Sequence, residues 1–143
     1  MTLPAPIEQF DSHFTKSSLR EISNEATNIT IPDGYKTIGN AAFKNRTCLQ
    51  TVTLPNSIVS IETEAFSGCT GLSSINFPSI LTFIGENAFA HCKELRILRL
   101  PAAMNKVSRN AFYNCDGLAY VHLENTCTIH PTAFKGCSHL QYN

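Results

Sequence analysis

Hydrophobic residues recur along this chain with a period of 23 residues. The dipeptide Ala-Phe occurs five times, and successive phenylalanines are 23, 23, 23 and 22 residues apart, at Phe43, Phe66, Phe89, Phe112 and Phe134. Isoleucine or valine stands five residues before each of these phenylalanines, and leucine stands six residues after each of them. Several apolar columns in one register are typical of a solenoid, in which stacked units share one continuous core.

Each unit also contains a short segment in which polar and apolar residues alternate, such as Thr51-Val52-Thr53-Leu54. A period of two predicts a strand, and equivalent strands of consecutive units should pair in parallel at about 4.8 Å. Proline follows this segment at positions 32, 55, 78 and 101, and it should end the strand because it has no backbone N–H to donate. The Ala-Phe segment is predicted to form a short helical or 3₁₀ turn on the opposite side. Its phenylalanine should be buried, which stabilises the fold by about 1.5–3 kcal/mol per ring.

The combined pattern, read from Leu49 to Leu72, is Leu-x-x-Val-x-Leu-Pro-x-x-Ile-x-x-Ile-x-x-x-Ala-Phe-x-x-Cys-x-x-Leu. It resembles the leucine-rich repeat of the BspA-like class, whose members occur in bacteria and protist parasites, often as surface or adhesive proteins. The resemblance covers residues 29–143, about five units. It implies an α/β repeat fold: a right-handed leucine-rich-repeat solenoid with parallel strands, short helical or 3₁₀ turns and an N-terminal helical cap.

The two ends of the chain are expected to differ. Residues 1–28 do not follow the repeat, and Ile7, Phe10 and Phe14 share one helical face, so this segment is predicted to be a helical cap on residues 29–143. At the other end no residue follows that would cover the layer of Phe134 and Leu140. An uncovered strand edge favours pairing with another chain. We therefore expect either a homodimer through the C-terminal edge or a piece of a longer array.

Four cysteines belong to the repeat, because Cys69, Cys92, Cys115 and Cys137 each follow a repeat phenylalanine by three residues. A metal site or disulfides are one interpretation, and a column of small buried side chains is the other. The second is favoured, since a 23-residue spacing resembles no zinc motif and cysteine is among the most buried residue types. No metal and no cofactor are expected.

Charge and motif content exclude several classes of function. The 11 basic and 11 acidic residues cancel, which argues against nucleic-acid binding. No apolar segment is long enough to insert into a membrane, and the N-terminus does not resemble a secretory signal, so the compartment stays open between the cytoplasm and the cell surface. His91 stands beside Cys92, but a nucleophile also needs a base, an oxyanion hole and a cleft. The protein is therefore expected not to be an enzyme.

The predicted strands present an outward face on which a partner would bind. Its first half carries small polar residues, whereas its second half carries Arg96, Ile97, Arg99, Tyr120 and His122, types that are frequent in binding hot spots. These five residues are the candidate partner-binding site of a protein–protein interaction module. The alternative is a structural or adhesive segment of a larger surface protein with no discrete site. A carbohydrate-binding module would need rows of exposed aromatic residues, and only Tyr120 offers one.

Overall fold

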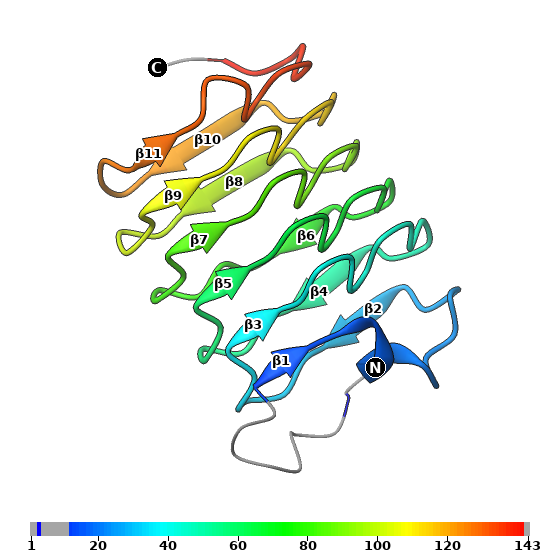
Figure 1. Cartoon of the computed structure of the whole chain (residues 1–143). Helices are drawn as coiled ribbons and strands as arrows, with labels where there is room; N and C mark the ends of the chain where they lie inside the picture. Colours follow the sequence, from blue (N-terminus) through cyan, green and yellow to red (C-terminus); the bar gives the residue numbers. More distant parts are fainter. Residues whose placement is uncertain (1–2, 4–11, 142–143) are drawn as a thin grey trace.

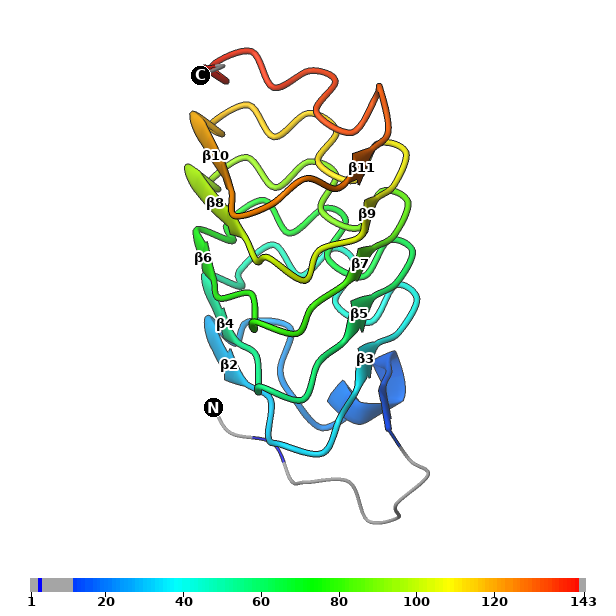
Figure 2. The same ribbon diagram turned by 90° about the vertical axis from the view of Figure 1, so that its left-hand side faces the viewer.

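The computed structural model describes residue 3 and residues 12–141. The chain coils into a stack of similar layers that runs from the N-terminal to the C-terminal end (Figure 1). Each full layer contributes one strand to each of two rows, and Figure 2 shows these rows on opposite sides of the coil. All pairings between strands of neighbouring layers are parallel.

The first row consists of the strands that the alternating segments predict. Its outward surface is called the strand face below. The row comprises β2 (Asn28–Thr30), β4 (Thr51–Thr53), β6 (Ser74–Ile75), β8 (Ile97–Leu100) and β10 (Tyr120–Leu123). It is divided into a three-stranded sheet, β2-β4-β6, and a two-stranded sheet, β8-β10. In the first of these sheets the Asn76 carboxamide bonds to the backbone N–H and C=O of Leu54, at 2.9 and 3.0 Å.

The second row forms one continuous six-stranded sheet that the sequence pattern does not reveal. It contains β1 (His13–Phe14), β3 (Thr37–Ile38), β5 (Ser60–Ile61), β7 (Phe83–Ile84), β9 (Lys106–Val107) and β11 (Thr128–Ile129). Each strand has only two residues, which is too short for an alternation to be recognised. The buried member is the column five residues before each repeat phenylalanine, as in Ile38, Ile61 and Ile84.

The phenylalanines form one continuous row through the core, as the repeat predicts. Phe43, Phe66, Phe89 and Phe112 are fully buried. Neighbouring rings lie with their centroids 4.7–5.3 Å apart and their planes within 8° of parallel, from Phe43 to Phe134. Such offset stacks are the favourable arrangement for aromatic rings. The predicted merging of successive layers into one elongated interior is confirmed.

The short helical turns predicted for the Ala-Phe segments are not found, because half of their N–H groups bond between layers. Phe43 donates to the carbonyl of Ala65 in the next layer at 2.7 Å, and Phe66 donates likewise to Ala88. The N–H groups in between close separate turns, as when Lys44 donates to Ala41 at 3.1 Å. Residues two positions either side of the phenylalanine have a left-handed backbone in most layers. This explains why the position two residues after it holds only Asn, Gly or His.

The N-terminal helical cap is also not found in the described residues. Ile7 and Phe10 lie outside the described residues. Phe14 belongs to β1, which pairs with β3, and its ring stacks on Phe43 at 5.4 Å. Only the 3₁₀ helix η1 (Lys16–Leu19) follows, so residues 12–28 form an irregular further layer of the stack. The backbone of β1 finds a ready partner in β3, and this pairing outweighs the helical periodicity. The division of the chain at residues 28 and 29 itself stays a prediction.

Candidate protein-binding surface

The five residues predicted to bind a partner lie together on β8 and β10. The parallel register places Tyr120 beside Ile97 and His122 beside Arg99, and Arg96 directly precedes β8. All five side chains are exposed. Residues between them, such as Leu98, point into the core, as expected for alternation on a strand. We call Arg96, Ile97, Arg99, Tyr120 and His122 the patch.

Ile97 and Tyr120 make the patch unusual for a solvent-facing sheet. Their exposed fractions are 56% and 45%, and they are two of the four large hydrophobic residues that are exposed in the described part of the chain. By contrast, the corresponding outward residues of the first sheet are the polar Asn28, Thr51 and Ser74, and the Thr51 hydroxyl donates to the Asn28 carboxamide oxygen. The strand face therefore has a polar half and an apolar, cationic half.

The polar groups of Arg96 and His122 in the patch have only weak partners. Arg96 Nη2 lies 3.3 Å from Glu94 Oε2, and His122 Nε2 lies 3.4 Å from Glu124 Oε1. All four side chains are more than half exposed, and ion pairs of this kind contribute about 0–1 kcal/mol. These side chains can exchange their present partners for those of another protein with little loss.

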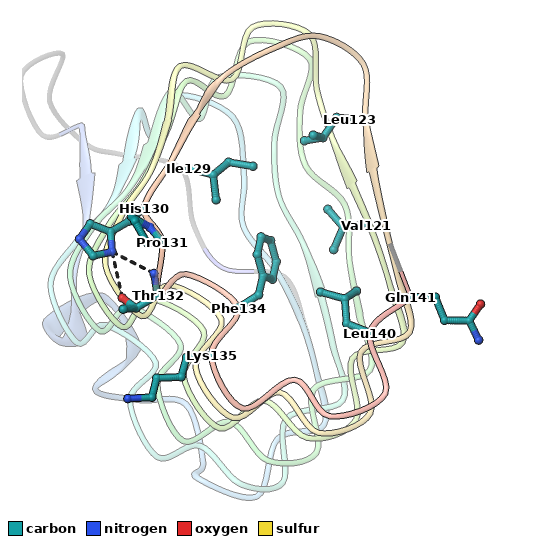
Figure 3. Close-up of a pocket in the computed structure, with 10 residues that line it drawn as sticks. All are labelled: Val121, Leu123, Ile129, His130, Pro131, Thr132, Phe134, Lys135, Leu140 and Gln141. Atoms are coloured by element: carbon teal, nitrogen blue, oxygen red, sulfur yellow. Dashed lines mark hydrogen bonds between the residues drawn. The ribbon is translucent and has the colours of Figure 1, made fainter. Parts of the chain in front are cut away.

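A second exposed apolar surface lies at the C-terminal end of the stack, which we call the C-terminal groove. It has a volume of about 550 Å³. Figure 3 shows Phe134 at its centre, with Ile129, Val121 and Leu140 around the ring. Leu123 is 43% exposed here, whereas Leu100 in the same column one layer earlier is fully buried. The groove is thus a face of the layer of β10 and β11 that no described residue covers.

His130 lies at one side of this groove. The Thr132 N–H donates to His130 Nδ1 at 3.1 Å, and this contact is drawn in Figure 3. In earlier layers the equivalent N–H donates to the following layer, as Glu64 does to the Glu86 carbonyl at 2.9 Å. The backbone donor of Thr132 is therefore satisfied within its own layer.

The repeat cysteines are structural, as the favoured interpretation predicts. Cys69, Cys92 and Cys115 are fully buried, and all six cysteines are free thiols. Each thiol of the column donates to the carbonyl of the phenylalanine one layer earlier, at 3.1–3.3 Å. Burial raises the pKa of Cys69 to about 12, so this thiol is not a nucleophile at neutral pH. Within the described residues no group of three or more His, Cys, Asp or Glu side chains could hold a metal ion.

Arg46 has a structural role that the sequence analysis missed. It occupies the cysteine position of the first Ala-Phe unit and is almost completely buried. Its guanidinium donates to the carbonyls of Ser23, Ile22 and Leu19, at 2.8, 3.2 and 3.5 Å. Burial lowers the pKa of Arg46, and hydrogen bonds to these three carbonyls offset the cost of burying its charge. The signal was available, since an arginine in a column of buried cysteines requires buried acceptors.

Similar proteins agree with this architecture. The sequence profile of the BspA type leucine-rich repeat region matches residues 13–141 as six copies. A leucine-rich cell surface protein from Faecalibacterium prausnitzii A2-165 is 33% identical, with a TM-score of 0.77, over 82% of this chain and 31% of its own. A leucine-rich repeat protein from Bacteroides ovatus is 32% identical, with a TM-score of 0.70. This match covers 80% of the present chain and 30% of the Bacteroides ovatus chain.

A third structure, from Eubacterium ventriosum, is 17% identical with a TM-score of 0.71 over 98% of this chain, and it supports the fold alone. The chain spans less than a third of the length of the first two relatives. None of the curated proteins shows a significant sequence match to it. No helix among the described residues is long and apolar enough to cross a membrane. The six-fold repeat match, the parallel coil and the stacked phenylalanines together place this chain in the BspA type leucine-rich repeat family.

Proposed function

We propose that this chain is a protein-binding module and that its partner docks on the patch. The observation that carries the proposal is the exposure of Ile97 and Tyr120 side by side on adjacent strands, flanked by arginines. Tyrosine and arginine are enriched in binding hot spots, and a rigid sheet holds them without loss of backbone entropy. The similarity to a cell surface protein favours a role at a cell surface for this chain as well.

A paired capture experiment tests this proposal. The intact chain and a patch variant, with Arg96, Arg99 and Tyr120 all changed to alanine, are used as baits on the same extract. A matched control variant changes Gln50, Thr53 and Ser73 to alanine on the polar half of the strand face. We expect a partner that is retained by the intact chain and the control variant and lost from the patch variant. A partner retained equally by all three baits would place the binding site elsewhere.

The alternative, a structural or adhesive segment without a discrete site, predicts a different result. In that case, no captured protein would depend on the patch, since any adhesion would be spread over many layers. The exposed apolar pair on an otherwise polar face favours a discrete site over this alternative.

A second candidate function, self-association through the C-terminal edge, is favoured by the C-terminal groove. Val121, Ile129 and Phe134 are only partly buried there, and β10 and β11 each pair with one neighbour among the described residues. Two copies that meet groove to groove would cover these side chains by a two-fold contact, which is the commonest symmetry of homodimers.

A further inference from the structure

We propose that the patch recognises an acidic segment of its partner protein, and that a carboxylate of this segment takes the place of Glu94 on Arg96, at the edge of the depression around Gly117. This inference rests on the proposed function, since it specifies the chemistry of the partner that docks on the patch. It is derived from a small depression beside the patch and from the contacts of Arg96.

The depression has a volume of about 430 Å³ and is called the Gly117 pocket. It is lined by Lys93, Arg96, Asp116, Gly117, Ala119 and His139. It adjoins the apolar pair directly, because Arg96 precedes Ile97 and Ala119 precedes Tyr120 in the chain. The pocket exists because Gly117 and Ala119 are small at positions where neighbouring layers carry Glu94, His139 and Arg96.

Gly117 determines where the Arg96 side chain lies. A Cβ atom at this position would be 1.6 Å from Arg96 Nη1 and 2.5 Å from the Lys93 carbonyl oxygen. The guanidinium therefore lies across the Cα atom of Gly117, and its Nη1 donates to the Lys93 carbonyl at 3.2 Å. One edge of the guanidinium is held by the backbone in this way, which orients the other edge.

The other edge already holds a carboxylate. Arg96 Nη2 donates to Glu94 Oε2 at 3.3 Å, and both side chains are more than half exposed. Glu94 thus marks the position of an anion, although the exposed pair contributes little. Glu94 accepts from Nη2, whereas a partner carboxylate that accepts two parallel hydrogen bonds from the planar guanidinium would bind more tightly.

The surrounding charges agree with an acidic ligand. Lys93 reaches Asp116 only at 3.9 Å, so its ammonium remains available to a second anion. Arg99 adds a positive charge next to the apolar pair. A basic segment would face like charges from Arg96, Arg99 and Lys93, which disfavours it. The nearby carboxylates of Glu94, Asp116 and Glu124 already have Arg96, Lys93 and His122 as partners. The partner segment is therefore expected to combine an Asp or Glu in the Gly117 pocket with a neighbouring aliphatic or aromatic residue on Ile97 and Tyr120.

Peptide display on the folded chain tests this inference. A library of random linear peptides, fused so that no free carboxyl terminus is exposed, is selected on the intact chain and on the patch variant. We expect peptides specific to the intact chain in which Asp or Glu stands close to an aliphatic or aromatic residue. Synthetic copies with amidated C-termini then give Kd values by fluorescence anisotropy, and the affinity should fall as salt is raised.

Single variants identify the role of the carboxylate. Glu94→Gln removes the competing anion and should tighten binding about twofold to fivefold. Arg96→Gln should weaken it on the order of tenfold or more. Glu86→Gln removes an exposed carboxylate from another face and should leave the Kd unchanged.

The outcomes separate the two proposals. Peptides that bind the intact chain and the patch variant equally would overturn the proposed function at this surface. Peptides that need the patch but lack acidic residues would overturn the acidic-ligand inference and leave the proposed function standing. A Glu94→Gln variant with unchanged affinity for acidic peptides would likewise contradict the proposal that a partner carboxylate replaces Glu94 on Arg96.

Discussion

At the scale of single residues, each column of the repeat has the same packing or hydrogen-bonding role in every layer. The phenylalanine fills the interior, and the cysteine three residues later donates its thiol hydrogen to a carbonyl of the preceding layer. A thiol suits this position because it is small and weakly polar, and it satisfies a buried acceptor. Packing and these hydrogen bonds therefore account for the column from Cys69 to Cys137.

The central ring of the row is expected to dominate stability. Phe89→Ala removes a fully buried side chain that stacks on Phe66 and Phe112, and it should lower the free energy of unfolding by about 3–5 kcal/mol. Urea denaturation followed by circular dichroism measures this change. The control is Phe83→Ala. Phe83 is a partly exposed residue of β7, and its loss should lower the free energy of unfolding by about 1 kcal/mol. Equal losses for both variants would contradict the layered core.

The buried thiols should resist alkylation and should destabilise the fold at high pH. Iodoacetamide at neutral pH is expected to modify exposed Cys48 quickly and Cys69 and Cys92 only on unfolding, as mass spectrometry can show. The pKa of Cys69 is about 12 in the folded chain against an ordinary value of 9.0. The unfolded chain therefore loses this proton first as the pH rises.

The contribution of each such thiol to the free energy of unfolding should accordingly be constant below pH 9 and fall between pH 9 and 12, by about 1.4 kcal/mol per pH unit. Urea denaturation at a series of pH values measures this slope. Rapid native alkylation of Cys92, or a stability that rises above pH 9, would show that the thiols are not buried as described.

At the scale of elements, the layers are held by hydrogen bonds between equivalent positions rather than by helices. The Ala-Phe turns bond to the next layer, and the two-residue strands of the second row do the same on the other side. The N-terminal layer lacks an Ala-Phe turn, and the Arg46 guanidinium binds its carbonyls instead. One side chain thus joins an irregular layer to the regular stack.

Loss of the Arg46 contacts should release the N-terminal layer selectively. Arg46→Cys restores the residue of the column but cannot reach the carbonyls of Leu19, Ile22 and Ser23. Hydrogen–deuterium exchange should accelerate in residues 13–28 by on the order of tenfold or more and stay unchanged in β7 and β8. Arg46→Lys keeps the charge and should show a smaller effect. Uniform acceleration along the chain would mean that Arg46 supports the whole stack.

At the scale of the whole molecule, the two sheets of the first row divide the strand face into different surfaces. The three-stranded sheet is polar and its side chains bond along the stack, whereas the two-stranded sheet presents the patch. The C-terminal groove adds apolar surface at the end of the coil (Figure 3). Both the patch and the groove lie in the C-terminal half.

Self-association through the groove should depend on concentration and on the exposed apolar side chains. Sedimentation velocity over a range of concentrations should show a monomer–dimer equilibrium for the intact chain. Leu123→Arg places a charge in the groove and should shift the equilibrium to monomer, while Ile80→Arg, on an exposed residue remote from the groove lining, should not. A monomer at all concentrations would exclude the homodimer.

The 23-residue pattern by itself determined the layers, the apolar columns, the buried cysteines and the exposed positions of Arg99 and Tyr120. The residue type that recurs in a column indicates whether the column is buried, and a repeat gives several examples of each column. Only the tertiary structure decided that the Ala-Phe segments are not helical, that Phe14 lies in a strand, and that Arg46 binds three carbonyls. It also decided that Gly117 leaves room for Arg96 beside Ile97. The partners of these hydrogen bonds lie about one repeat apart in sequence, so only the folded stack brings them together.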